Sequence, residues 1–467
     1  MSEGVIFPVG MHGISSLESE FAGCTFKDER LLKRVLRIAE RVEREPGWSF
    51  PRAFADPSQL EAVYRFVGNE RVSLGDVVSG HITNTVKRLS STKRYLAIHD
   101  TTSFSFEGER EELGTVDRTQ RGFYAHVCLC VSAEGTREPM GLLAIDTWTR
   151  DEKKGKRTTK QRKAEPNLES GRWLEQSLNV EELVPESTEL IHVEDREADI
   201  YESLEMRIAH NMHFIVRAAS AKVVLTDNGT ENILDYARTL PVVTKREIHL
   251  SARKAKHSTL RPNAQHPPRK ERDSRIEIRA GKMRLRKPVM SGTLPELHLN
   301  AVHVLEMDAP AGEKPVEWLL LTTESIASVA KVETIVDNYR ARWLIEEYFK
   351  ALKTGCKYEE RQLESLHALL NALGIFAVMA WRLLQLRFIE RSASDAPATT
   401  IASPAEIAIL ESEARMPRGA SAHEFLRRLA RFGGHLPQNG PPGLLILWRA
   451  LSTLLQRARG FELALKM

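Results

Sequence analysis

Two short apolar segments, Tyr95-Leu-Ala-Ile-His-Asp100 and Leu190-Ile-His-Val-Glu-Asp195, each end in an aspartate and have the length and composition of strands. Side chains alternate faces along a strand, so each aspartate shares a face with the apolar residue two positions earlier, Ile98 or Val193. We therefore expect both carboxylates at the rim of a sheet on a packed face, where they need a cation or strong donors to stay charged. Either aspartate could instead cap a following helix or turn.

The segments around these two predict a mixed sheet. Further strands are expected at Phe123–Val131, Met140–Trp148 and His213–Arg217, and helices at about Leu168–Leu178 and Ala198–Ala209. The order β-β-β-α-β-α-β is typical of a three-strand meander followed by crossover units. It predicts an α/β fold with helices on the faces of a mixed sheet.

The length of 467 residues predicts about three domains. A helical domain is expected at 1–90 and an α/β domain at 91–355. The α/β domain is interrupted at about 222–325 by alternating segments that predict a β-rich insertion. The last part, 356–467, is expected to be mostly helical.

Positive charge is concentrated in a few places. The net charge is only +4, but Lys245–Lys287 alone carries +11, which leaves −7 for the remainder. A second basic run lies at Lys153–Lys163, and Phe21–Arg44 predicts a basic amphipathic helix. Such runs are often solvated loops, but three of them together favour a polyanionic partner.

The cysteines and the apolar runs bear on the cellular compartment. The four cysteines show no C-x-x-C spacing, and the N-terminus lacks the pattern of a signal peptide. No uninterrupted apolar run reaches the ~18 residues that a membrane span needs. We expect a soluble protein in a reducing cytoplasm, with no membrane partner.

A long helix is predicted from Val332 to Lys353. At 100° per residue its polar side chains fall within an arc of about 80°; they are Tyr339, Arg342, Glu346, Lys350 and Lys353. An apolar set lies on the opposite side and is expected to pack on a sheet; it comprises Leu344, Ile345, Tyr348 and Leu352. A charged stripe is usually inert, but one carboxylate among cations and a tyrosine also suits one wall of a phosphate site.

Three carboxylates from separate elements, Asp100, Asp195 and Glu346, suit hard divalent cations better than zinc. Two Mg²⁺ ions about 4 Å apart, with Mn²⁺ as a substitute, can activate a water or a 3′-hydroxyl for phosphoryl displacement. Nearby cations would hold the phosphate backbone. The residues therefore predict a metal-dependent site for a phosphodiester.

The spacing Tyr339-x₂-Arg342-x₃-Glu346-x₆-Lys353 resembles the Y-R-E-K motif of the bacterial insertion-sequence-four family of DDE transposases, which includes the transposon-five transposase. The resemblance spans roughly Phe21 to Leu386. Further segments that look like this family are His99-Asp-Thr-Thr102, Asp195-Arg-Glu-Ala-Asp199, Trp318-Leu-Leu-Leu-Thr-Thr323 and Arg342-Trp-Leu-Ile-Glu-Glu347.

The resemblance implies a ribonuclease-H-like catalytic domain with Asp100, Asp195 and Glu346 as its acidic triad. It implies DNA contacts near the cleavage site by the motif residues Tyr339, Arg342 and Lys353, to which the residues themselves add Lys350. Trp318 matches an aromatic that stacks on a flipped base, and Arg217 matches a phosphate-contacting arginine. Taken alone, Trp318 could be a core residue and Arg217 could pair with a surface acid.

The implied activity is cut-and-paste transposition, in which strand nicking, hairpin formation, hairpin opening and strand transfer share one site. The partners would be the terminal inverted repeats and the target DNA, bound by a homodimer in a paired-end complex, and the enzyme would be nucleoid-associated in a bacterial cytoplasm. The helical domain would recognise the inverted repeat, with Arg30, Lys33, Arg34 and Arg37 as candidate contacts.

The C-terminal helices would supply dimerisation, although their leucines suit an intramolecular core equally well; these residues are Leu444, Leu445, Ile446, Leu447, Leu451, Leu454 and Leu455. Two functions compete with transposition: a ribonuclease-H-like structure-specific nuclease and a non-catalytic end-binding repressor.

Overall fold

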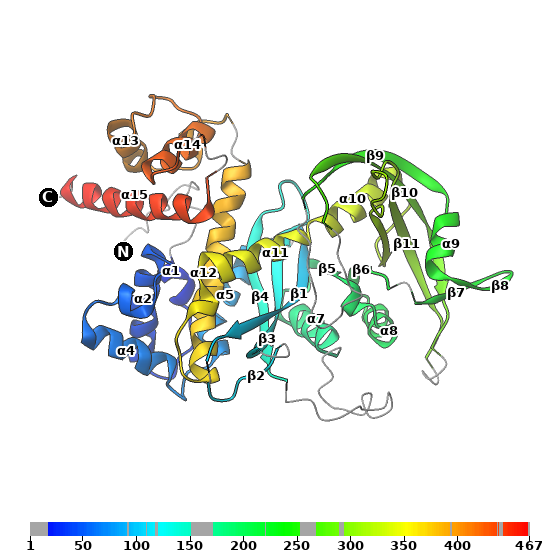
Figure 1. Cartoon of the computed structure of the whole chain (residues 1–467), viewed down its shortest axis with the longest axis horizontal. Coiled ribbons are helices and arrows are strands. Elements are labelled where there is room, and N and C mark those ends of the chain that lie inside the picture. Colours follow the sequence, from blue (N-terminus) through cyan, green and yellow to red (C-terminus); the bar gives the residue numbers. More distant parts are fainter. Residues whose placement is uncertain are drawn as a thin grey trace.

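One mixed sheet of twelve strands runs through the middle of this computed structural model (Figure 1). The structure describes residues 17–90, 93–108, 110–116, 120–150, 171–219, 221–252, 268–288, 294–392, 395–436, 438 and 442–465.

The first half of the sheet has the order β4-β3-β1-β5-β6. Its strands are β1 (Arg94–Phe106), β3 (Arg121–Ser132), β4 (Pro139–Trp148), β5 (Glu189–Glu194) and β6 (His213–Arg217). Strands β1, β3 and β4 form an antiparallel meander, whereas β5 and β6 run parallel to β1. The short strand β2 (Gly114–Thr115) pairs with β3. The mixed sheet predicted from the sequence is confirmed.

The insertion prolongs this sheet instead of forming a separate one. Its last strand, β12 (Glu317–Thr322), pairs antiparallel with β6, and the order then continues β11-β10-β7-β8, with β9 on β10. The other elements are β7 (Val223–Thr226), β8 (Gly229–Asn232), α9 (Ile233–Thr239), β9 (Val242–Leu250), β10 (Arg272–Leu285) and β11 (Leu297–Glu306).

Different helices cover the two faces of the strand pair β1 and β5. On one face α7 (Gly171–Leu183) packs Val180 against Tyr95 and Ala97 of β1. The predicted helix at 198–209 is a 3₁₀ turn, η2 (Arg196–Ala198), followed by α8 (Tyr201–Ala209). On the other face Ile98 belongs to the main core together with residues of α10 (Val329–Arg340) and α11 (Trp343–Lys350). After α11 come the π turn η3 (Ala351–Gly355) and the 3₁₀ turn η4 (Tyr358–Glu360).

Helix α12 (Leu366–Ser392) contacts the N-terminal helices, strand β4 of the sheet and the C-terminal helix α15 (Leu444–Leu465). Its Asn371 side-chain amide donates to the carbonyls of Val67 and Val72, at 2.8 and 3.0 Å, and its Trp381 indole donates to the Pro139 carbonyl of β4 at 3.0 Å. Residues 366–389 are long and apolar enough to cross a membrane, but 94% of the most apolar window is buried inside the protein. The apolar character of α12 is therefore explained by its place in the core.

The N-terminal helices pack on this central helix. They are α1 (Leu17–Phe21), α2 (Glu29–Arg44), α3 (Phe50–Ala53), α4 (Pro57–Val67) and α5 (Leu74–Arg88). Side chains at the N-termini cap the three long ones: Asp28 for α2, Asp56 for α4 and Ser73, in a capping box with Asp76, for α5. Helix α2 turns Val35, Ile38 and other apolar residues inward, so its basic residues face outward, as its pattern predicts.

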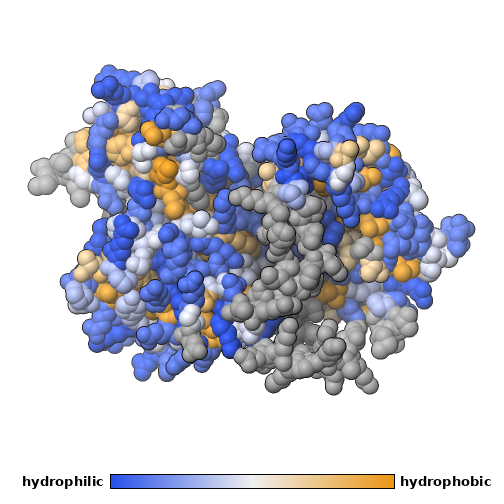
Figure 2. Space-filling model, in the orientation of Figure 1, coloured by the Kyte–Doolittle hydropathy of each residue, from blue (hydrophilic) through white to orange (hydrophobic). Residues whose placement is uncertain are grey.

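The C-terminal helices form a lobe beside the N-terminal ones. They are α13 (Pro404–Glu413), α14 (Ala422–Phe432) and α15 (Leu444–Leu465), with a short 3₁₀ turn, η5 (Ala398–Thr400), before them. Leu447, Leu451 and Leu454 are buried within the chain, so for these three the structure selects the intramolecular core. The surface of the face shown in Figure 2 is mostly hydrophilic, with small hydrophobic patches on this lobe.

Candidate active site

A partly buried ion pair joins the first predicted carboxylate to the motif arginine. Arg342 Nη1 donates to Asp100 Oδ2 at 2.7 Å, and the Thr101 backbone N–H donates to Asp100 Oδ1 at 2.8 Å. Burial raises the pKa of Asp100 to about 7; Arg342 opposes the rise, and the nearby Glu346 and Asp195 add to it. The three predicted carboxylates therefore lie close enough to repel one another.

The other two carboxylates come from separate elements. Asp195 follows β5 and accepts the Glu197 backbone N–H at 2.7 Å, so it also caps η2, as the structural alternative predicted. Glu346 lies in the first turn of α11, and its Oε1 is 3.5 Å from Arg342 Nη2. Although burial opposes it, the surrounding Asp100, Tyr339, Glu346 and Asp195 hold the pKa of Arg342 above its ordinary value. One guanidinium thus serves a crowded set of acids.

The prediction of one regular helix over 332–353 is wrong. Helix α10 ends at Arg340, and the next turns are tighter, with Arg342 N–H bonding to the Tyr339 carbonyl and Ile345 N–H to the Arg342 carbonyl, each at 3.1 Å. After α11 the chain widens into the π turn η3, which carries Lys353. A mid-helix change of winding is common at functional sites, and here it occurs next to Arg342 and Glu346.

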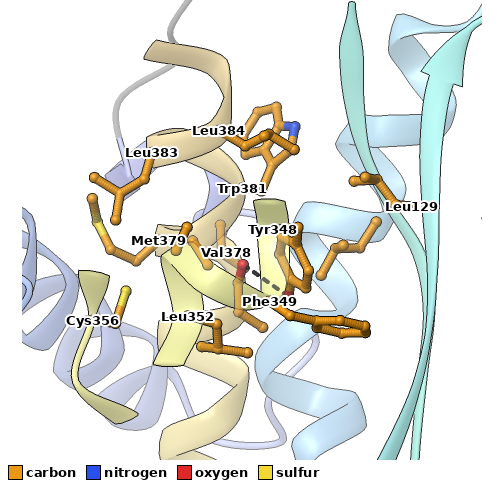
Figure 3. Close-up of a cluster of buried hydrophobic side chains, with 14 of the residues drawn as sticks. Leu129, Tyr348, Phe349, Leu352, Cys356, Val378, Met379, Trp381, Leu383 and Leu384 are labelled. Atoms are coloured by element: carbon orange, nitrogen blue, oxygen red, sulfur yellow. Dashed lines mark hydrogen bonds between the residues drawn. The ribbon is translucent and has the colours of Figure 1, made fainter. Parts of the chain in front are cut away.

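The apolar side of α11 packs against helix α12 as well as against the sheet, so the expected sheet contact is only part of the packing. Figure 3 shows Tyr348, Phe349 and Leu352 beside Val378 and Trp381 of α12. The Tyr348 hydroxyl donates to the Ala377 carbonyl at 3.3 Å. This packing fixes the helix that presents Glu346 and Arg342.

Three further predicted residues gather at the edge of the acid cluster. The Tyr339 ring packs edge-on against Trp318, with 5.7 Å between ring centroids. Arg217 lies close enough to the Tyr339 side chain to interact with it electrostatically, and its Nη2 donates to the Glu317 carbonyl at 3.2 Å. Burial lowers the pKa of Arg217, and burial raises that of Tyr339. Strands β6 and β12 bring these residues together because Arg217 pairs in register with Leu320.

The two lysines of the stripe differ. Lys353 Nζ donates to the Ser103 carbonyl of β1 at 2.6 Å and lies 5.2 Å from the centre of the Phe104 ring, so it is held against the strand that carries Asp100. Lys350, at the end of α11, is exposed.

The predicted DNA-binding residues of α2 lie on its outer side. Arg30 forms an ion pair with Asp28 at 2.7 Å, and Lys33 and Arg37 are exposed, whereas Arg34 is half-buried. The basic run at 153–163 lies outside the described residues, as do residues 253–267 within the second basic segment.

One exposed aromatic that adjoins Arg342 in the sequence is absent from the predicted site residues. Trp343 directly follows Arg342 and begins the helical turn that contains Glu346. The residue is 58% exposed. At 100° per residue it falls about 20° beyond Lys350, at the margin of the charged arc, where periodicity does not single it out. Exposure of so large a ring is the signal that only the structure supplies.

A second group of potential metal ligands lies near the acid cluster but on the other face of the sheet. It comprises His99, His192 and Glu194, all buried. His99 and Glu194 directly precede Asp100 and Asp195, and His192 lies two positions before Glu194. Because side chains alternate faces along β1 and β5, all three point away from Asp100 and Asp195.

Two protein families match this chain. The transposase DNA-binding family matches residues 15–72, and the transposase DDE domain family matches residues 195–382. The first match covers helices α1 to α4. The second begins at Asp195 and includes Arg217, Trp318 and the whole segment from Tyr339 to Lys353.

Among solved structures, the chain is similar to the piggyBac transposase synaptic complex with hairpin DNA. It has 9% sequence identity and a TM-score of 0.38, over 81% of this chain and 72% of that chain. The two matches give this chain a transposase DNA-binding domain followed by a DDE transposase domain, and the mixed sheet is that of a ribonuclease-H-like catalytic fold. A DDE transposase domain implies a nuclease or transposase enzyme that acts on DNA. Such domains generally use divalent metal ions.

Proposed function

We propose that this protein is a cut-and-paste transposase of the insertion-sequence-four type, in which Asp100, Asp195 and Glu346 hold two Mg²⁺ ions. The observation that carries the proposal is the convergence of carboxylates on one arginine: Asp100 Oδ2 accepts from Arg342 Nη1 at 2.7 Å, and Glu346 Oε1 lies 3.5 Å from Arg342 Nη2. Such a set of oxygen donors with too little positive charge suits hard divalent cations. When bound, the cations supply activation of a water or 3′-hydroxyl and stabilisation of the leaving oxygen.

The protein's own groups would orient the DNA around this centre. Arg342 holds the Asp100 carboxylate in place through the 2.7 Å hydrogen bond. Tyr339 and Arg217 form a donor pair beside the acids, which suits a phosphate of the transposon end. The exposed Lys350 would neutralise a neighbouring phosphate. Lys353, which is hydrogen-bonded to the Ser103 carbonyl, would contact the DNA backbone from β1.

Aromatic rings next to the acids suit a base that has left the stack. Trp318 packs against Tyr339, and Trp343 is exposed beside Arg342. Stacking of a base on an aromatic ring is worth about 1–3 kcal/mol. These rings support hairpin formation at the same site, because a hairpin forces at least one base out of the duplex.

The helical N-terminal part would bind the terminal inverted repeats, and a homodimer would pair two ends. The exposed cations Lys33 and Arg37 on α2 support the first role. Salt-dependent binding of an end duplex, with a smaller salt slope for Lys33→Ala, is the result expected for a phosphate contact. A slope equal to that of the wild type would remove Lys33 from the interface.

The function is tested by incubating the full-length protein with duplex ends and Mg²⁺ and resolving the products. We expect a nick with a 3′-hydroxyl, a hairpin and strand-transfer products. Glu346→Gln should abolish all three while leaving end binding unchanged. Glu347→Gln is the matched control, because the neighbouring Glu347 pairs with Arg391 at 2.8 Å and not with the acid cluster.

The products also separate this proposal from its competitors. Cleavage without strand transfer would indicate a structure-specific nuclease. Binding with no product of any kind would indicate an end-binding repressor. Cleavage retained by Glu346→Gln would refute the assignment of Glu346 as a metal ligand.

A further inference from the structure

The start of strand β12 extends past the region in which it pairs with β6. Register pairs between the two strands begin only at Leu320 of β12. Among the described residues, Glu317 and Trp318 therefore pair on one side alone, with Leu305 and Val304 of β11. The end of β12 that carries Trp318 depends on other contacts to hold its position.

The two residues at this strand end project to opposite faces of the sheet, because side chains alternate along a strand. Trp318 packs on the main core and against Tyr339, which is the face of the acid cluster. Leu319, two positions after Glu317, belongs to the core that includes α9 on the other face. The Glu317 side chain therefore lies behind the acid site, on the side of α9.

Arg217 lies on the same face as Trp318, because its register partner Leu320 belongs to the main core. In the described part of the chain no carboxylate pairs with its guanidinium, and its Nε is buried without a hydrogen-bond partner. Its Nη2 donates to the Glu317 backbone carbonyl at 3.2 Å. A guanidinium without a counter-ion suits a phosphate, and the Glu317 carbonyl fixes where this one lies.

The Glu317 carboxylate is held by side chains from two other elements. Arg238 of α9 donates from Nε to Oε1 at 2.9 Å and from Nη2 to Oε2 at 3.0 Å, which is a bidentate pair. His303 of β11 is fully buried, and its Nε2 lies 2.9 Å from Oε1. Although burial opposes it, these two partners lower the pKa of Glu317, so the carboxylate is charged and accepts from both.

This pair differs from an ordinary surface ion pair, which contributes little. The Glu317 side chain is only 16% exposed and has three donor atoms around it. Arg238 also pairs with the exposed Asp235 at 3.1 Å, but both of those residues belong to α9. One arginine thus binds two acids, of which only Glu317 connects it to β12.

We propose that Glu317 is a positioning residue for DNA at the acid site. Its carboxylate is fixed by Arg238 and His303 on the far face of the sheet. Its backbone in turn holds the strand end from which Trp318 stacks on a flipped base and Arg217 reaches a phosphate. The inference rests on the proposed function, because that function assigns both residues to the transposon end.

Hairpin formation is the step that depends most on this strand end. Nicking by a water requires the acids and a positioned phosphate, whereas the hairpin also requires a base to leave the duplex. An aromatic ring contributes to that step only if it lies where the base arrives, and small displacements of such groups are costly. Loss of the Glu317 contacts should therefore change the ratio of hairpin to nicked product more than it changes nicking.

The test measures nicked and hairpin products formed by the full-length protein from a duplex transposon end with Mg²⁺. Glu317→Ala should lower hairpin formation about tenfold and nicking less than about threefold. Arg238→Ala removes the bidentate partner from the half-exposed side, should shift the ratio in the same direction, and keeps the test decisive if Glu317→Ala does not fold. Asp235→Ala is the matched control, because it removes the other acid bound to Arg238 and should leave both products unchanged.

A second background separates positioning from a general loss of structure. In Trp318→Ala the stacking ring is already absent, so adding Arg238→Ala should lower the ratio by a smaller factor than it does in the wild type. The same factor in both backgrounds would overturn the proposal. A fall of nicking and hairpin by equal factors in Glu317→Ala and Arg238→Ala would also overturn it, because that result indicates a structural role alone.

The wild-type products test the proposed function separately. A wild-type protein that nicks but forms no hairpin would refute the cut-and-paste proposal, and this inference with it. A wild-type protein that forms the hairpin, with the same ratio in folded Glu317→Ala and Arg238→Ala, would refute this inference alone and leave the proposed function intact.

Discussion

The same three parallel strands, β1, β5 and β6, carry a buried carboxylate cluster toward each end, and the two clusters are opposite in character. Near the carboxyl ends, Asp100 meets two other acids and one arginine, and burial raises its pKa to about 7. At the amino ends, Glu324 receives Arg94 Nη1 and Nη2 at 2.8 and 2.9 Å and His213 Nδ1 at 2.8 Å. Although burial opposes it, these donors lower the pKa of Glu324 to about 2.

The difference fits the proposed catalytic role of Asp100 and a structural role for Glu324. The Glu324 cluster is complete within the protein, because each carboxylate oxygen has a cationic donor. The Asp100 cluster has one arginine for three carboxylates. A bound metal cation would supply the missing positive charge. Burial alone does not distinguish them, whereas the sign of the pKa shift does.

The largest expected effect comes from neutralising the first cluster. Asp100→Asn should lower DNA cleavage by at least about 10³-fold, which is about 4 kcal/mol of transition-state stabilisation. The melting temperature should not fall, because the amide removes a charge that Asp195 and Glu346 repel. Cleavage assays and thermal unfolding check both halves, and a variant that is both destabilised and active would reverse the comparison.

Neutralising the second cluster should do the opposite. Glu324→Gln should lower the free energy of unfolding at pH 7 by up to about 3 kcal/mol, because a shift of each pKa unit is worth about 1.4 kcal/mol. Cleavage by the folded fraction should be retained. The control is Glu189→Gln, which removes the more exposed partner of Arg94 and should cost less than about 1 kcal/mol. Equal losses for the two variants would contradict the distinction.

The pH dependence of stability should follow the same residue. A depressed folded pKa means that Glu324 stabilises the protein above its unfolded pKa of about 4.5, and that this contribution is lost as the pH falls toward about 2. The difference in unfolding free energy between the wild type and Glu324→Gln should therefore shrink from pH 5 toward about pH 2. Denaturant unfolding at several pH values measures it, and a constant gap would exclude Glu324 as its source.

The smallest expected effect is stabilisation by the metal itself. Mg²⁺ at ten times its dissociation constant should raise the free energy of unfolding by about 1.4 kcal/mol through binding to the folded state. Removal of Mg²⁺ should reverse the gain, and Asp100→Asn should show little of it. Equal stabilisation of wild type and variant would place the metal elsewhere.

Much of the catalytic fold could be predicted from local pattern. The short apolar runs before Asp100 and Asp195 predict their strands, although β1 does not end at Asp100 but continues to Phe106. Tyr339, Arg342 and Glu346 follow helical spacing closely enough to suggest a common site. The change of winding after Arg340 could not be predicted, because tertiary packing of α11 on α12 decides it. Each residue there is compatible with a regular helix.

The two clusters away from the acid site were also out of reach of the sequence. Arg94 and Glu324 are 230 positions apart. They meet only because the start of β1 and the end of β12 lie at the same end of the sheet. His99 and His192 are separated by 93 positions and look, one by one, like ordinary core histidines. Their meeting depends on the β1–β5 register, which no local pattern encodes.

Because β12 is hydrogen-bonded to β6, the strands of the insertion extend the same sheet that contains β1 and β5. Four strand spacings separate β5 from β10, which amounts to about 19 Å at the usual distance between neighbouring strands. DNA bound by the basic residues of the insertion would lie at a fixed distance from Asp195. Under the proposed function, a longer insertion would bind DNA further out without moving Asp100, Asp195 or Glu346, so DNA binding by the insertion and cleavage at the acids could change independently.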